Sequence, residues 1–118
     1  MRQSERNAKQ RAAVYIRSAA HNEAATAEQR KECREYIDRK GYEYAGEYVD
    51  IGARGIANIR SAFDAMTIDA HIGEIDKIIV ISLARISRNA KEAISFCNDL
   101  KESCGVVVEA VEGSVLQQ

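Results

Sequence analysis

The sequence predicts a three-layer α/β domain with a mostly parallel sheet of four to five strands and helices on both faces. Apolar, β-branched runs alternate with helical patterns in the order strand, helix, strand, helix, strand, helix, strand. Residues 77–83 are almost continuously apolar, as in a strand covered on both faces. Right-handed crossovers between parallel strands place helices on both sides of a sheet. With 118 residues, the chain has the length of one domain.

The composition excludes several classes of protein. Lys and Arg number 17 against 18 Asp and Glu, so the net charge is -1 and a basic surface over the whole domain is excluded. A hydrophobic content of 46% argues against disorder. The 3 cysteines lack CxxC spacing, which indicates neither a disulfide framework nor a zinc site. Without a long apolar run or signal peptide, we expect a cytoplasmic protein with no membrane partner.

The first strand is predicted over residues 12–17, from their β-branched and aromatic side chains. The first helix is predicted over residues 26–40. Thr26 and the residues after it have the form of a capping box, and Gly41 has the position of a left-handed C-terminal cap. Its expected buried face consists of Cys33, Tyr36 and Ile37.

Residues 42–50 show partial alternation, which predicts a second strand followed by a flexible, glycine-bearing loop over residues 51–55. Ser61 and Asp64 have capping-box spacing, so a second helix is predicted to begin there and to end near Gly73. Its apolar positions are Ile59, Phe63, Met66 and Ala70.

The last third of the chain predicts a strand, a helix and a strand. They cover residues 77–83, 90–104 and 106–111, with Gly105 ending the helix. The helix repeats apolar residues at helical spacing, which predicts its buried face. These residues are Ala90, Ala93, Ile94, Cys97, Leu100 and Cys104.

Five arginines follow three of the predicted strands. In open α/β sheets, ligands bind beyond the carboxyl ends of the strands. Arginine suits phosphate there, because its planar fork donates two parallel hydrogen bonds and keeps its charge. We therefore predict a local anion site, with surface ion pairs as the alternative interpretation. The five arginines at these strand ends are Arg17, Arg54, Arg60, Arg85 and Arg88.

Several segments resemble one family. Residues 15–19, Tyr-Ile-Arg-Ser-Ala, resemble the Tyr-x-Arg-x-Ser strand of the serine site-specific recombinases, the resolvase/invertase family. Gln29 is similar to a glutamine in their first helix. Residues 50–60 resemble their Asp-x-x-x-Ser-Gly loop and downstream arginine. Residues 78–89 resemble the apolar strand that leads into Leu-Asp-Arg-Leu-x-Arg-Asn. The resemblance extends over residues 12–113, a resolvase-like catalytic domain.

This resemblance implies an α/β/α resolvase-like fold and a DNA recombinase without metal or other cofactor. Members cleave DNA with a serine that becomes linked to a 5′ phosphate, in site-specific integration, excision, inversion or resolution, and act as homo-oligomers. Arginines can stabilise the charge on a transferring phosphoryl group. By position, the active-site arginines of this chain are Arg17, Arg60, Arg85 and Arg88.

Three positions depart from the family pattern. Ala19 stands at the nucleophile position, Ala84 replaces an aspartate, and Arg54 replaces a serine. Ser18 is next to the missing nucleophile, but alternation places it on the opposite face from Arg17 unless a bulge redirects it. We therefore expect a phosphate-binding pocket with lost or weakened cleavage, and the residues leave open whether the chain is an enzyme.

Residues 1–11 are expected to form a mobile, mildly basic arm, and residues 114–118 to begin a connection to a missing C-terminal region. Because the family uses that region for tight DNA binding, we expect weak DNA affinity from this domain. The alternative function is a non-catalytic DNA- or phosphate-binding module with a flavodoxin-like fold. Neither GxGxxG nor GxxxxGK occurs, which disfavours nucleotide binding.

Overall fold

The computed structural model of the chain describes residues 9–19, 22–52 and 60–112. Several predictions lie outside these residues: most of the basic arm, Arg54 and its neighbours in the 51–55 loop, and the connection at 114–118. No helix in the described ranges is long and apolar enough to cross a membrane.

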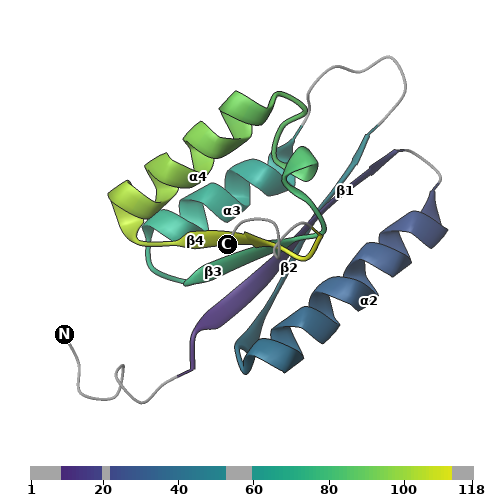
Figure 1. The fold of residues 1–118 in the computed structure, drawn as a ribbon, viewed down its shortest axis with the longest axis horizontal. Helices are drawn as coiled ribbons and strands as arrows, with labels where there is room; N and C mark the ends of the chain where they lie inside the picture. Colours follow the sequence, from purple (N-terminus) through teal and green to yellow (C-terminus); the bar gives the residue numbers. More distant parts are fainter. Residues whose placement is uncertain (1–8, 20–21, 53–59, 113–118) are drawn as a thin grey trace.

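The sheet has four strands, and all of them are parallel (Figure 1). They are β1 (Arg11–Ala19), β2 (Glu43–Gly52), β3 (Lys77–Val80) and β4 (Val107–Ala110), in the order β2-β1-β3-β4. The predicted fold class is therefore confirmed. Because β1 has a strand on either side and helices above and below, its residues 12–16 are fully buried.

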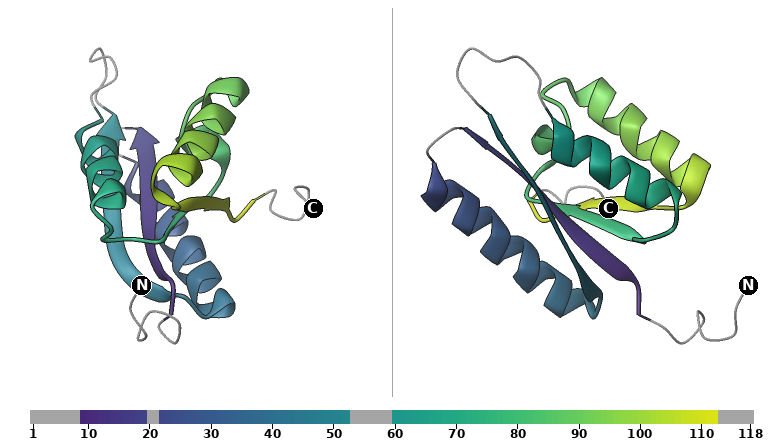
Figure 2. Two further views of the ribbon diagram at one scale, coloured as in Figure 1. Left: turned by 90° about the vertical axis from the view of Figure 1, so that its left-hand side faces the viewer. Right: turned by 180° about the vertical axis from the view of Figure 1, so that it is seen from behind.

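Helices cover both faces of the sheet (Figures 1 and 2). Helix α2 (Glu23–Lys40) packs on one face, and α3 (Ser61–His71) and α4 (Ala90–Cys104) pack on the other. Side chains of β1 alternate between the two hydrophobic cores. The core under α2 contains Ala12, Val14, Ile16, Cys33, Tyr36, Ile37 and Ile79. The core under α3 and α4 includes Ala13, Tyr15, Met66, Ala70, Ile78, Val80, Ala93 and Leu100.

The C-terminal ends of α2 and α4 lie where their glycines predict them. Helix α4 spans Ala90–Cys104, the predicted residues. Gly41 and Gly105 both have φ of 76°, the left-handed conformation that glycine adopts most readily at a helix end. Both residues end their helices as predicted.

The predicted capping box at Thr26 is wrong. Helix α2 begins at Glu23, and Asn22 is its cap, because Asn22 Oδ1 accepts a hydrogen bond from Ala25 N at 3.1 Å. Thr26 lies inside the helix, where its hydroxyl donates to the Asn22 carbonyl at 3.1 Å. The asparagine therefore satisfies a free N–H group of a first turn that begins earlier than predicted.

The third strand is shorter than predicted, because β3 ends at Val80 and Leu83–Arg85 form a single 3-10 turn, η1. The predicted buried face of α4 is also wrong at Ala90 and Ile94. Both residues are exposed, Ile94 at 52%, and line an open surface pocket instead. Position on a helix face predicts burial only where another element covers that face.

Candidate functional site

The start of α3 is held by a side chain from the neighbouring strand. The Asp50 carboxylate accepts hydrogen bonds from Ala62 N at 2.9 Å and from Phe63 N at 3.0 Å. The predicted capping box at Ser61 is therefore wrong: Asp50, at the end of β2, satisfies these N–H groups from outside the helix. A carboxylate is also favoured there by the helix dipole.

Tyr15 joins this carboxylate to the centre of the sheet. Its hydroxyl donates to Asp50 Oδ2 at 2.7 Å, and its ring contacts Phe63 edge-on with centroids 5.4 Å apart. Burial and the hydrogen bond to Asp50 raise the pKa of Tyr15 to about 12, so the phenol stays protonated at neutral pH. Tyr15 therefore acts as a hydrogen-bond donor to Asp50.

The guanidinium of Arg60 connects Tyr15 to η1. Arg60 Nη2 donates to the Tyr15 hydroxyl at 3.1 Å and to the Arg85 carbonyl at 2.9 Å. Arg60 Nη1 donates to the Ile86 carbonyl at 2.8 Å. The guanidinium also lies 4.0 Å from the ring centroid of Phe63, a cation–π contact. Arg60 thus bridges α3, β1 and η1.

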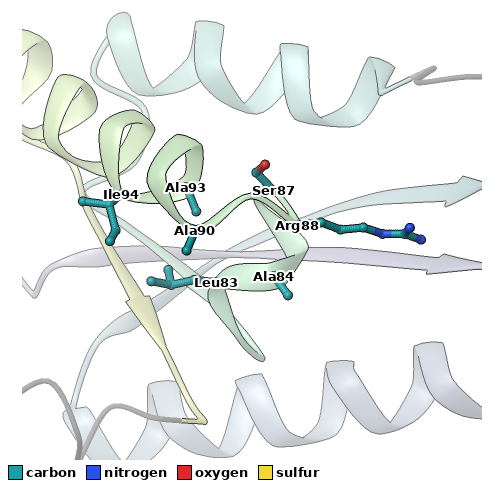
Figure 3. Close-up of a pocket in the computed structure, with 7 residues that line it drawn as sticks. All are labelled: Leu83, Ala84, Ser87, Arg88, Ala90, Ala93 and Ile94. Carbon is teal, nitrogen blue, oxygen red and sulfur yellow. The ribbon is translucent and has the colours of Figure 1, made fainter.

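Arg85 and Arg88 follow β3 in and just after η1. Arg85 is half-buried, and its Nε is buried without a hydrogen-bond partner among the described residues. Arg88 is exposed and extends away from the pocket that it borders (Figure 3). That pocket has a volume of about 160 Å³. Its lining is mostly apolar and consists of Leu83, Ala84, Ser87, Arg88, Ala90, Ala93 and Ile94.

The end of β1 turns its side chains in two directions. Ser18 is 6% exposed, and its Oγ accepts a hydrogen bond at 2.9 Å from Gln29 Nε2 of α2. Gln29 also donates to the Arg17 carbonyl at 3.2 Å. By strand alternation, Arg17 and Ala19 share the opposite face with Tyr15. Arg17 pairs in register with Asp50.

The structure therefore brings some of the sequence-predicted residues together and separates others. Arg60 and Arg85 are joined through the Arg85 carbonyl, and Arg17 lies on the same face of the sheet. Ser18 lies on the other face. Arg54 lies outside the described residues.

The sequence analysis missed the contribution of Tyr15 and Asp50, which are 35 residues apart. Their only signal in the sequence was a place in the motifs that carry the family resemblance.

Among the described residues, the two arginines beyond β3 keep their guanidinium groups unpaired. Within the described ranges, the side chains of Arg85 and Arg88 have no hydrogen-bond partner. Guanidinium groups that are not paired inside the protein can donate to phosphate oxygens. No hydroxyl of β1 shares this face at position 18 or 19, because Ser18 faces α2 and position 19 is alanine. At these positions β1 therefore offers this face no hydroxyl nucleophile.

Comparison with known structures identifies similar folds. The N-terminal catalytic domain of TP901-1 integrase has a TM-score of 0.77 and 22% identity, over 88% of this chain and 79% of that one. A resolvase family site-specific recombinase from Streptococcus pneumoniae has a TM-score of 0.76 and 26% identity, over 90% and 74%. The C-terminal catalytic domain of ISC1926 TnpA, an IS607-like serine recombinase, has a TM-score of 0.73 and 24% identity, over 87% and 68%.

Sequence comparison gives the family. No curated protein matches the chain. The family described as the resolvase N-terminal domain matches residues 12–117, nearly the whole chain. This match confirms the resemblance inferred from the motifs around Arg17 and Arg85, and the chain belongs to the resolvase N-terminal domain family of serine recombinases.

Proposed function

We propose that this domain binds backbone phosphates of DNA through Arg17, Arg85 and Arg88 and has lost, or greatly weakened, strand cleavage. Family membership supports DNA as the partner and self-assembly of the protein, and both belong to the proposal. The guanidinium groups of Arg85 and Arg88, unpaired within the described ranges, support phosphate binding.

The loss of cleavage is carried by one observation, the hydrogen bond from Gln29 to Ser18. A nucleophilic oxygen must reach phosphorus in line with the leaving oxygen. Ala19 has no such oxygen, and the neighbouring Ser18 Oγ is bonded to Gln29 on the α2 side of the sheet. Cleavage through Ser18 would require this strand end to rotate.

Cleavage is tested by trapping a covalent adduct with a DNA duplex that carries a nick, so that a cut strand end diffuses away. The wild-type domain is expected to form no protein–DNA adduct on a denaturing gel, because no hydroxyl reaches the phosphate. Ser18→Ala is the matched control for the remaining hydroxyl. An adduct that forms with the wild type and disappears in Ser18→Ala would contradict the proposal.

Phosphate binding is tested by the salt dependence of affinity for a fluorescein-labelled DNA duplex. Each arginine that contacts a phosphate contributes about 0.9 to the slope of log affinity against log salt. Arg85→Gln and Arg88→Gln should each lower that slope by about this amount. Arg39→Gln, in the last turn of α2, is the matched control.

The proposal fails if both variants bind the duplex with the wild-type affinity and slope. A mononucleotide that displaces the duplex with a much shallower salt dependence would instead identify a flavodoxin-like binding module.

A further inference from the structure

Arg60 uses most of its hydrogen-bonding capacity inside the protein. Its Nε and Nη2 both donate to the Tyr15 hydroxyl, at 3.4 and 3.1 Å, and Nη2 also donates to the Arg85 carbonyl. Nη1 donates to the Ile86 carbonyl. A guanidinium has five N–H groups, so these bonds leave one for an external ligand. This arginine therefore cannot offer phosphate a bidentate fork while the bonds are made.

We infer that Tyr15, Asp50 and Arg60 form a positioning relay that orients Arg85 and Arg88 toward a bound phosphate. This inference rests on the proposed function, because phosphate binding is what the relay serves. Arg60 is accordingly a positioning residue, as are Tyr15 and Asp50, which contact no ligand themselves.

The first half of the relay fixes Arg60. Asp50 is 6% exposed, and one carboxylate binds both the Tyr15 hydroxyl and the first N–H groups of α3. Arg60 is the residue immediately before α3, so the same carboxylate sets where its backbone lies. The Tyr15 hydroxyl then accepts from the guanidinium itself. Arg60 is thus held at its backbone and at its side chain.

The second half of the relay fixes the turn. Residues 83–85 form one short 3-10 turn, and Ser82, the residue just before it, makes no side-chain cap. Arg60 binds two successive carbonyls there, and Ile86 is buried at 2% exposure. A planar guanidinium can bridge two carbonyls and a hydroxyl at once, whereas a lysine ammonium is a single point charge. The turn that carries Arg85 and precedes Arg88 is therefore clamped by Arg60.

Replacing the charged Asp50 distinguishes a positioning role from a purely electrostatic effect on anion binding. Asp50→Asn removes a negative charge near the site, which alone would tighten the binding of an anion. Loss of the relay would instead weaken it, because asparagine cannot accept as a carboxylate from both α3 and Tyr15. The two effects have opposite signs.

The experiment compares Tyr15→Phe and Asp50→Asn with Tyr48→Phe, the matched control. Tyr48 also donates its hydroxyl to a carboxylate of the fold, Asp69, at 2.5 Å, but among the described residues it makes no hydrogen bond to an arginine. Arginine Nε–H signals are recorded by NMR without ligand, and affinity for the labelled DNA duplex is measured by fluorescence anisotropy.

Tyr15→Phe removes the hydroxyl that joins Asp50 to Arg60, so it is expected to shift the Nε–H signals of Arg60, Arg85 and Arg88 and to weaken duplex binding about fivefold. Asp50→Asn is expected to weaken binding as well. Tyr48→Phe should lower thermal stability and leave both the arginine signals and the affinity unchanged.

The inference is overturned if folded Tyr15→Phe keeps the wild-type signals of Arg85 and Arg88, or if Asp50→Asn binds the duplex more tightly. If the wild type binds no duplex, the proposed function fails, and the ligand-free signals still decide the relay. If Tyr15→Phe does not fold, Arg60→Lys replaces it. If Arg60→Lys weakens duplex binding as much as Arg60→Gln does, the result supports positioning. If Arg60→Lys binds the duplex with nearly the wild-type affinity, Arg60 contacts the phosphate directly through its charge instead.

Discussion

At the scale of single residues, Glu109 makes stability depend on pH. Its carboxylate accepts from the hydroxyls of Tyr36 at 2.8 Å and Tyr42 at 3.0 Å, and Lys77 Nζ lies 3.3 Å away. Burial alone would raise the pKa of Glu109, but the two tyrosine hydrogen bonds and Lys77 outweigh it and lower that pKa. A carboxyl group whose pKa is lowered by folding stabilises the fold at neutral pH.

The free energy of unfolding should therefore fall as the pH drops from just above the ordinary glutamate pKa, about 4.3, through the lower pKa of the folded state. Glu109→Gln should remove this part of the pH dependence and cost about 1–2 kcal/mol at neutral pH. Urea unfolding at a series of pH values measures both, with exposed Glu102→Gln as control. An unchanged acid slope in Glu109→Gln would assign the effect to other carboxylates.

At the scale of elements, β2 contains a bulge. Ala12 pairs with Tyr44 and Val14 with Glu47, so two residues of β2 lie opposite Ala13 alone. One of them, Gly46, has a backbone φ of 108°, a conformation that residues other than glycine rarely adopt.

Gly46→Ala should destabilise the domain by about 1–3 kcal/mol through backbone strain at its positive φ. A Cβ there would meet no atom within 4 Å, so a steric clash would not contribute to the loss. Gly52→Ala, in the same strand, is the control, since its Cβ would make an ordinary 3.6 Å contact with the Ser18 carbonyl and its φ is unstrained. Thermal unfolding followed by circular dichroism measures both variants. Equal losses would show that strain at the bulge is not the cause.

At the scale of the whole molecule, the two cores share β1 and should unfold together. Ile37 lies in the core under α2 and is 1% exposed. Ile37→Val should cost about 0.5–1.5 kcal/mol, and the amides of α4, on the other face, should lose the same protection from hydrogen exchange. Ile68→Val is the control, because Ile68 is 60% exposed. Loss of protection confined to α2 would mean that the faces open separately.

Much of the fold could be predicted because its signals are local. The apolar period and the flanking glycine were sufficient for α4, since helix periodicity and a left-handed cap involve residues close in sequence. Helix α3 does begin at Ser61, as predicted, but the group that caps it could not be found in this way, because the cap is Asp50, 12 residues before Ala62 and in another element. Ser61, the local candidate, makes no side-chain cap.

The sequence by itself determined the fold class, the order of the elements and the family, since these depend on periodicity, crossover handedness and residue spacing. It also determined that Ala19 supplies no hydroxyl. Strand alternation placed Ser18 on the face opposite Arg17, but only the tertiary structure decided that Gln29 is its partner there and that Arg60 is engaged by Tyr15 and η1. The physical reason is that these hydrogen bonds join groups brought together by packing, which no pattern along the chain encodes.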